Sequence, residues 1–129
     1  MPTQRPNILL VVLDTTRRDR LSLYGHAAST SPNLDAFAAG ATRYDRAIAA
    51  AQWTVPSHAS MFTGLYPATH GVTQSTSAIS GMHPTAPEIL RGAGYQTVAF
   101  CNNPLVGVLN NGLQRGFERR QLAVLHREA

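Results

Sequence analysis

The feature that most constrains this chain is an uninterrupted apolar run near its start, Asn7–Asp14 (NILLVVLD), which ends on an acid. Apolar residues that continue without alternation are typical of a parallel strand that is buried on both faces. An acid that closes such a strand lies at its carboxyl end, where open α/β sheets bind ligands. The run therefore predicts the first strand of an α/β sheet, with Asp14 at the ligand-binding edge.

Proline and glycine divide the rest of the chain into short elements. The predicted elements are a helix from Ser31-Pro32 to Gly40, a short strand over Thr42–Ala50, a helix from Pro56 or Ser57 to Thr63 that Gly64 ends, a loop over Leu65–Pro84, a helix over Thr85–Gly94, a strand over Tyr95–Cys101, a loop over Asn102–Gly116 and a helix over Phe117–His126. Strands that alternate with helices predict a doubly wound, mostly parallel α/β sheet with flanking helices.

The amino-acid composition limits which binding partners and which cellular location are expected. All 11 basic residues are Arg, the formal charge is +4, and the arginines are scattered without interleaved aromatic residues. This pattern argues against nucleic-acid binding and agrees with a small anionic substrate. The apolar stretch Ile8–Leu13 is too short for a signal-peptide core or a membrane span, so we expect no membrane segment and a cytoplasmic location. The single cysteine, Cys101, excludes an internal disulfide and is expected to be a buried reduced thiol.

Several side chains are suited to hydrolytic chemistry. The carboxylate of Asp14 is a ligand for a divalent cation, although an acid in this place is also a common turn residue. Thr54 lies where a helix N-terminus favours an anion, and a hydroxyl beside a metal ion can attack a tetrahedral ester centre. His58, one helical turn later, can contact anionic substrate oxygens. The alternative is a Thr54 that only caps its helix and an exposed His58. His70, in the following loop, either faces the same pocket or titrates freely.

Three longer stretches resemble the N-terminal signatures of the sulfatase family, in the alkaline phosphatase superfamily. They read NILLVVLDTTRRDRLSLYG, TSPNLDAFAAGATRYDRAIA and WTVPSHASMFTGLYPATHGV, and a looser match covers Thr85–Phe117. The resemblance implies an alkaline phosphatase-like fold and a metal-dependent hydrolase of sulfate esters. It also implies that Asp14 is the first metal-binding acid and that Thr54, at the nucleophile position, is a second ligand. The resemblance leaves the divalent metal open among Ca, Mn, Mg and Zn.

The nucleophile motif departs from the family pattern C/S-x-P-x-R, in which the first residue becomes formylglycine. Here it reads TVPSH, from Thr54 to His58. Threonine cannot form that aldehyde, so formylglycine is not expected. Thr15 also stands where many sulfatases have a second acid. An unmodified threonine is similar to the nucleophile of phosphodiesterases and phosphoglycerol transferases of the same superfamily, so phosphoryl transfer is the alternative function.

A third hypothesis is an inactive, truncated product. The resemblance implies a downstream Asp-His or Asp-Asn pair that completes the metal site, and the tail 118–129 does not align with the family. We therefore expect residues 1–129 to be a partial N-terminal catalytic domain that is inactive and marginally stable by itself. His126 and Glu128 are candidates to replace the missing ligands, favoured only by their ligand type.

Overall fold

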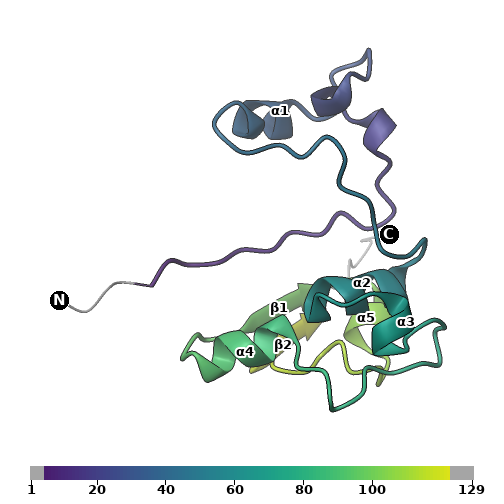
Figure 1. Cartoon of the computed structure of the whole chain (residues 1–129). Coiled ribbons are helices and arrows are strands. Elements are labelled where there is room, and N and C mark those ends of the chain that lie inside the picture. Colours follow the sequence, from purple (N-terminus) through teal and green to yellow (C-terminus); the bar gives the residue numbers. More distant parts are fainter. Residues whose placement is uncertain (1–4, 123–129) are drawn as a thin grey trace, which may run out of the picture. The chain divides into compact units, whose positions relative to one another are not determined.

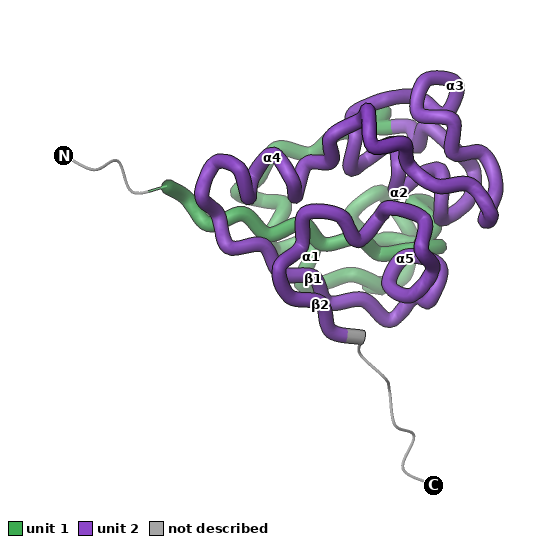
Figure 2. Tube along the Cα trace, turned by 90° about the horizontal axis from the view of Figure 1, so that it is seen from below, with its two compact units in different colours: residues 1–47 green, residues 48–129 purple. Residues whose placement is uncertain are grey.

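The computed structural model describes residues 5–122, which form two compact units divided between Ala47 and Ile48 (Figures 1 and 2). In chain order the described elements are η1 (Arg18–Arg20), η2 (Ser22–Tyr24), α1 (Pro32–Ala38), α2 (Thr54–Thr63), α3 (Pro67–His70), α4 (Ala86–Gly92), β1 (Val98–Cys101), α5 (Pro104–Gly107) and β2 (Arg119–Leu122). Over residues 5–122, none of the helices combines the length and the apolar character that a membrane span requires.

Helix α1 forms where the sequence predicts a helix in unit 1. Pro32 is its first residue, where the fixed φ of proline suits a helix and the missing N–H costs nothing. The Ser31 hydroxyl does not cap the helix backbone. It donates instead to Oδ1 of Asp35 at 3.0 Å, and the Ser22 hydroxyl donates to Oδ2 of Asp35 at 2.7 Å. One carboxylate therefore ties α1 to η2, and polar side chains hold this part of unit 1 together.

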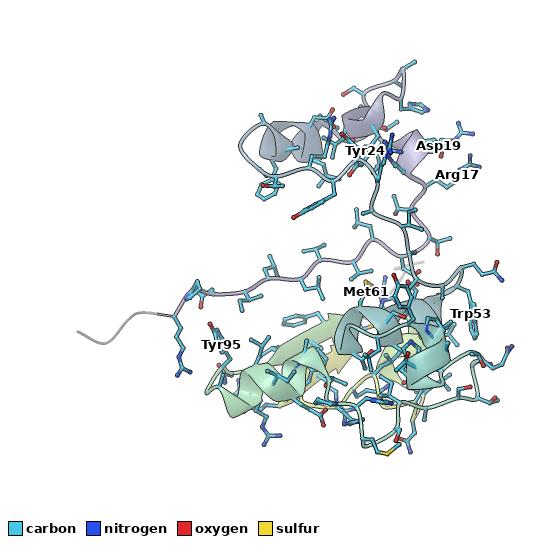
Figure 3. The ribbon with its side chains drawn as sticks, in the orientation of Figure 1. Arg17, Asp19, Tyr24, Trp53, Met61 and Tyr95 are labelled. Atoms are coloured by element: carbon cyan, nitrogen blue, oxygen red, sulfur yellow. The ribbon has the colours of Figure 1, made fainter. Side chains whose placement is uncertain are left out.

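Arginines of unit 1 are engaged with neighbouring side chains (Figure 3). Arg17 pairs with Asp19 at 2.6 Å, and the hydrogen bond from Arg17 lowers the pKa of Asp19. The Cζ atoms of Arg18 and Arg43 lie 4.7 and 5.7 Å from the centroid of the Tyr24 ring, within the range of cation–π attraction. The Arg17–Asp19 pair is exposed, so it contributes little to stability.

Two predicted strands are wrong. The structure has no strand within residues 7–14, where the chain runs as an extended trace (Figure 1) and Leu9 is 87% exposed. Residues 42–50 contain a turn and no strand, and Tyr44 and Ile48, which were predicted to share one face, are both exposed. A strand requires hydrogen bonds to a partner strand, and apolar composition alone does not supply the partner.

Helix α2 begins in unit 2 at Thr54, earlier than the predicted start at Pro56 or Ser57. The Ser57 N–H donates to the carbonyl oxygen of Trp53 at 3.2 Å and closes the first turn. Pro56 is then the third helical residue, where the backbone N–H has no partner within a helix, so proline is tolerated. The predicted end is confirmed, because Gly64 follows the last residue with a φ of 70°, the left-handed conformation typical of helix C-termini.

The apolar core of unit 2 forms around one side of α2. Val55 and Ala59, one turn apart on the helix, are both fully buried. They form a cluster with Val72, Ile79 and Leu113, and the half-buried side chains packed against this cluster are Trp53, Phe62, Leu105 and Val106. The core therefore joins α2 to three later segments of the chain, and it fixes which side of α2 faces inward.

Three short helices surround this core. Helix α4 confirms the helix predicted over Thr85–Gly94. The single-turn helices α3 and α5 interrupt segments that were predicted to be loops, and each begins with a proline. A proline at the first helical position favours one turn of helix even where apolar periodicity is weak. Contacts within unit 2 join α2 to each of α3, α4 and α5.

The described sheet consists of β1 and β2, which pair in parallel with Val98 opposite Arg119 and Cys101 opposite Leu122. Strand β1 confirms the strand predicted over Tyr95–Cys101. The predicted helix over Phe117–His126 is wrong for residues 119–122, because pairing with β1 overrides the local helical preference, and residues 123–129 lie outside the described part. The thiol of Cys101 is half-buried rather than buried, and it donates to the carbonyl of Asn103 at 3.3 Å.

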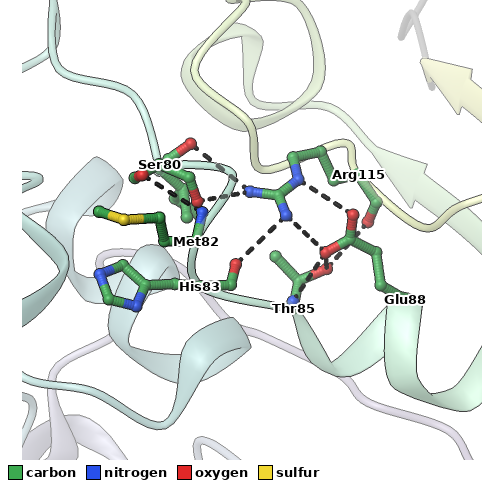
Figure 4. A network of polar contacts seen from close by, with 7 residues as sticks. Ser80, Met82, His83, Thr85, Glu88 and Arg115 are labelled. Carbon is green, nitrogen blue, oxygen red and sulfur yellow. Dashed lines mark hydrogen bonds and ion pairs between the residues drawn. The ribbon is translucent and has the colours of Figure 1, made fainter.

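A network of hydrogen bonds around Arg115 connects several segments of unit 2 (Figure 4). The Arg115 guanidinium donates to both carboxylate oxygens of Glu88, at 3.0 and 2.8 Å, and to the carbonyl oxygens of Ser80 and His83. The Thr85 N–H donates to the same carboxylate and completes a capping box at the start of α4. Burial raises the pKa of Glu88, but these hydrogen bonds outweigh burial and lower it. Glu88 therefore stabilises the fold above the ordinary carboxyl pKa, and this stability is lost as the pH falls through the lowered value.

Gly116 lies between Arg115, the centre of this network, and the start of β2. Its φ is +85°, and a Cβ atom at this position would collide with the backbone of Pro87 and Glu88. The carbonyl oxygen of Gly116 accepts a hydrogen bond of 2.6 Å from the Thr97 hydroxyl, just before β1. Only a glycine allows this close approach between α4 and the segment that leads into β2.

We expect Gly116→Ala to destabilise unit 2 by several times more than the matched change Gly64→Ala. Both positions have positive φ, at which alanine costs roughly 1–2 kcal/mol, but a Cβ atom at Gly64 meets nothing within 4 Å. Urea unfolding followed by the fluorescence of Trp53, the single tryptophan, measures both losses. Equal losses would contradict the importance of the close approach at Gly116.

Candidate active site

Thr54 is the first residue of α2, so its side chain lies at the end of the helix where backbone N–H groups are unpaired. Trp53, labelled in Figure 3, is the N-cap and is extended, with φ of −146° and ψ of 171°. Burial of Val55 and Pro56 fixes the direction in which the first turn leaves the core. The helix dipole and the unpaired N–H groups favour an anion at this end. The sequence predicts Thr54 just before the start of this helix, and the structure has it as the first helical residue, at the same end.

His58 is only 6% exposed, so the alternative interpretation of an exposed histidine is wrong. Its Nδ1 lies 2.8 Å from the carbonyl oxygen of Thr54, and Nδ1 donates because a carbonyl oxygen can only accept. The ring packs edge-on against Phe62, with 6.3 Å between centroids. The described residues provide no hydrogen bond to Nε2. Since every fully buried side-chain nitrogen or oxygen among them has a partner, Nε2 retains contact with solvent.

His70 ends helix α3 and is 3% exposed. Its Nε2 lies 2.9 Å from the Ser60 hydroxyl, and its Nδ1 accepts the backbone N–H of Val72 at 3.0 Å. Burial lowers the pKa of His70, and the nearby charge of His83 lowers it further. Because the ring is buried and both of its nitrogens are hydrogen-bonded, the alternative of a freely titrating loop histidine is wrong. Sequence reasoning missed the partnership with Ser60, because the two residues lie ten positions apart and share no recognised motif.

Asp14 lies in a tight turn of unit 1, in which the Thr16 N–H donates to the carbonyl oxygen of Leu13 at 3.3 Å. The next residue, Thr15, has a φ of 64°. This left-handed conformation is unfavourable for a β-branched side chain. Strained backbone of this kind concentrates at functional sites in proteins. Thr15 stands at the position where the family pattern often has a second acid. The residue type alone does not indicate that the backbone at Thr15 has a positive φ.

The structure brings together some of the predicted site residues. Thr54 and His58 lie on one helix and are joined by a hydrogen bond. Asp14 belongs to unit 1, whereas Thr54 belongs to unit 2, so a joint metal site of these two residues stays a prediction. Within the part of the chain that is described, no group of three or more His, Cys, Asp or Glu side chains could hold a metal ion. His126 and Glu128 lie outside that part.

Comparison with known proteins gives the family of this chain. The sequence model of the Sulfatase family matches residues 6–122, which includes the first residues of the segment 118–129. The chain is 35% identical over 95 residues to an N-acetylglucosamine-6-O-sulfatase of Bacteroides thetaiotaomicron, over 74% of this chain and 17% of the relative. It is also 35% identical over 98 residues to human arylsulfatase A, over 71% of this chain and 19% of the relative. The chain thus spans less than a fifth of the length of these relatives.

The fold is similar to that of a crystal structure of the phosphonate monoester hydrolase of Agrobacterium radiobacter. The TM-score is 0.78 and the sequence identity is 31%, over 96% of this chain and 27% of that protein. This likeness and the parallel pairing of β1 with β2 confirm the predicted α/β fold class, with helices flanking a parallel sheet as in alkaline phosphatase-like hydrolases. Because the family match extends over nearly all of the described residues, the chain belongs to the sulfatase family.

Proposed function

We propose that this protein is a metal-dependent hydrolase of sulfate esters in which Thr54 is the nucleophile. Asp14 and Thr54 bind a divalent cation, and His58 contacts the anionic oxygens of a small ester substrate. The observation that carries the proposal is the position of Thr54 as the first residue of α2, in a chain that matches the sulfatase family over residues 6–122. A sulfate group is a tetrahedral anion, which is the kind of ligand that a helix N-terminus favours.

The chemistry of Thr54 follows from its position. Thr54 is the first residue of a ten-residue helix, so it lies at the end where the partial positive charge of the helix dipole stabilises negative charge. The same charge stabilises the alkoxide that forms when the hydroxyl loses its proton. Attack of this oxygen on the sulfur atom forms a sulfate ester of Thr54 and breaks the bond between sulfur and the substrate's bridging oxygen. The leaving oxygen takes up the proton that Thr54 lost and departs as the alcohol, and water then hydrolyses the threonine sulfate and restores the hydroxyl. Because α2 is anchored in the core through Val55 and Ala59, the hydroxyl is held in a constant position.

The donor atoms of Asp14 and Thr54 fit a divalent cation in type, because carboxylate and hydroxyl oxygens are hard ligands suited to Ca, Mg and Mn. A divalent cation would supply Lewis-acid charge that lowers the pKa of the threonine hydroxyl. Two ligands are fewer than a stable divalent site needs, so we infer weak metal affinity for the two residues alone.

His58 is suited to binding an anion beside Thr54. Its Nδ1–H is committed to the Thr54 carbonyl oxygen, which fixes the orientation of the ring within the first turn of α2. The remaining nitrogen, Nε2, retains contact with solvent and is the ring atom that can face an anionic oxygen. An arginine in this place would offer a fork of several N–H donors, whereas the histidine ring offers one nitrogen to the substrate.

A second candidate function is the hydrolysis of phosphodiesters or phosphonate esters, including transfer of a phosphoglycerol-type group. The similarity to a phosphonate monoester hydrolase favours it, as does an unmodified threonine that cannot become formylglycine. Sulfate and phosphate esters have the same tetrahedral geometry, and Asp14, Thr54 and His58 would serve both reactions.

The partial-domain assignment, the absence of nucleic-acid partners and the cytoplasmic location stay predictions.

The metal proposal is tested by isothermal titration calorimetry with MnCl₂ and CaCl₂. We expect weak binding by the chain, and Asp14→Asn and Thr54→Val should each lower the affinity by about tenfold or more, because each removes an oxygen ligand. Asp45→Asn is the matched control, since Asp45 is an exposed acid of unit 1 that pairs with Arg43 at 2.9 Å. Unchanged affinity in both site variants would refute the assignment.

The nucleophile proposal is tested by intact-mass and peptide mass spectrometry after incubation with Mn²⁺ and an aryl ester. With 4-nitrophenyl sulfate, we expect a longer form of the chain that supplies the remaining metal ligands to release 4-nitrophenol. Thr54→Ser should retain this release and Thr54→Val should abolish it, because valine has no hydroxyl. Thr69→Ala, an exposed change on α3, is the control. Activity only with bis(4-nitrophenyl) phosphate, with a phosphoryl adduct on the Thr54 peptide, would favour the second candidate.

A further inference from the structure

We propose that Ser60 and His70 form a positioning pair that holds helix α2 in its active orientation only while the His70 ring is neutral. The inference rests on the proposed function, because α2 carries Thr54 and His58. The pair lies outside that site, on the far part of the same helix and at the end of α3. Both side chains are buried.

The hydrogen bonds fix the tautomer of His70. A backbone N–H can only donate, so the 3.0 Å contact from Val72 requires a lone pair on Nδ1. The proton of the neutral ring is then on Nε2, which donates to the Ser60 hydroxyl oxygen at 2.9 Å. Because Nε2 already carries a proton, His70 cannot accept one from Ser60. The pair is therefore a structural clamp and not a nucleophile with its base.

The clamp connects three parts of unit 2. Ser60 lies on α2 next to the fully buried Ala59, His70 ends α3, and Val72 belongs to the apolar core. Gly64 and Gly71, both with positive φ, reverse the chain after α2 and after α3. One imidazole thus bonds the helix on one side and the core segment on the other. Rotation of α2 about its axis would break the bond to Ser60.

Protonation of His70 is incompatible with this arrangement. A proton on Nδ1 would point at the Val72 N–H, so two donors would face each other around a buried charge. The ionisable groups on the packed elements are few. His83 acts on His70 through its charge, and the other ionisable side chain of α2, His58, is bonded to Thr54. Helix α3 and the segment 72–79 contain no other ionisable residue.

The clamp requires a neutral His70 ring, so its contribution to stability decreases in acid. The pKa of His70 is lower in the folded chain than in the unfolded chain, because burial and the charge of His83 both disfavour the cation. The clamp therefore contributes its full stability above the ordinary histidine pKa. That contribution is lost as the pH falls through the lowered pKa of His70. Mild acid is expected to loosen α2 before it unfolds the rest of unit 2.

The first experiment uses the unchanged 129-residue chain. Long-range ¹H–¹⁵N NMR of the histidine rings should give the Nε2–H tautomer for His70 at neutral pH, and a titration midpoint below that of the same chain in urea. Trp53 at the start of α2 provides a second observable, and its fluorescence should change with the same midpoint. An Nδ1–H tautomer, or a midpoint equal to the value in urea, would overturn the proposal.

Variants separate the clamp from general packing. His70→Gln keeps a donor for Ser60 and cannot titrate, so the acid transition of Trp53 fluorescence should disappear. Ser60→Ala should speed amide exchange in α2 by about fivefold, the effect of one hydrogen bond, whereas the exposed change Thr69→Ala should not. His83→Gln should raise the midpoint of His70, because it removes a repelling charge. Persistence of the fluorescence transition in His70→Gln would overturn the proposal.

These measurements need neither metal nor turnover, so they separate the clamp from the proposed function. If the His70 tautomer and titration behave as expected while Asp14→Asn and Thr54→Val leave metal binding unchanged, the proposed function fails and the clamp stands. If metal binding depends on both residues while the acid transition is unaffected by His70→Gln, the clamp fails and the proposed function stands.

Discussion

The burial of one side of helix α2 is the constraint on which the rest of unit 2 depends. Val55 and Ala59 are fully buried one turn apart, so the helix can adopt only one rotation about its axis. That rotation sets the positions of Thr54 at the open end, His58 one turn later and Ser60 beyond it. The apolar core is small, so few apolar side chains hold α2 in place. The hydrogen bonds of α2 therefore contribute more to its stability than they would in a larger core.

Hydrogen bonds connect the segments of unit 2 that the apolar core leaves unjoined. Arg115 joins Glu88 to two backbone carbonyl groups, and Gly116 permits the close approach of that segment to α4. The same segment then enters β2, so the network determines where the second strand lies beside β1. The His70 clamp has a similar role at the other side of α2. In both places, one side chain with several hydrogen bonds connects different segments of unit 2.

Local rules predicted the helices better than the strands. Ser31-Pro32 and Thr85 mark helix starts, and Gly64 marks a helix end, because caps, fixed φ and positive φ are properties of a few adjacent residues. The strands predicted at residues 7–14 and 42–50 are wrong, since a strand depends on a partner that composition does not specify. Residues 119–122 show the converse, because pairing with β1 makes a strand of a segment predicted to be helical.

The sequence by itself determined the family resemblance, the α/β class and the presence of Thr54 and His58 at one helix N-terminus, because these depend on residue type and short spacing. Only the tertiary structure decided that His58 bonds the Thr54 carbonyl, that Thr15 is strained, and that His70 is a neutral partner of Ser60. These features arise from burial and from contacts between distant segments. A linear pattern of letters does not encode which ring nitrogen meets a donor, so the tautomer of His70 follows from the fold alone.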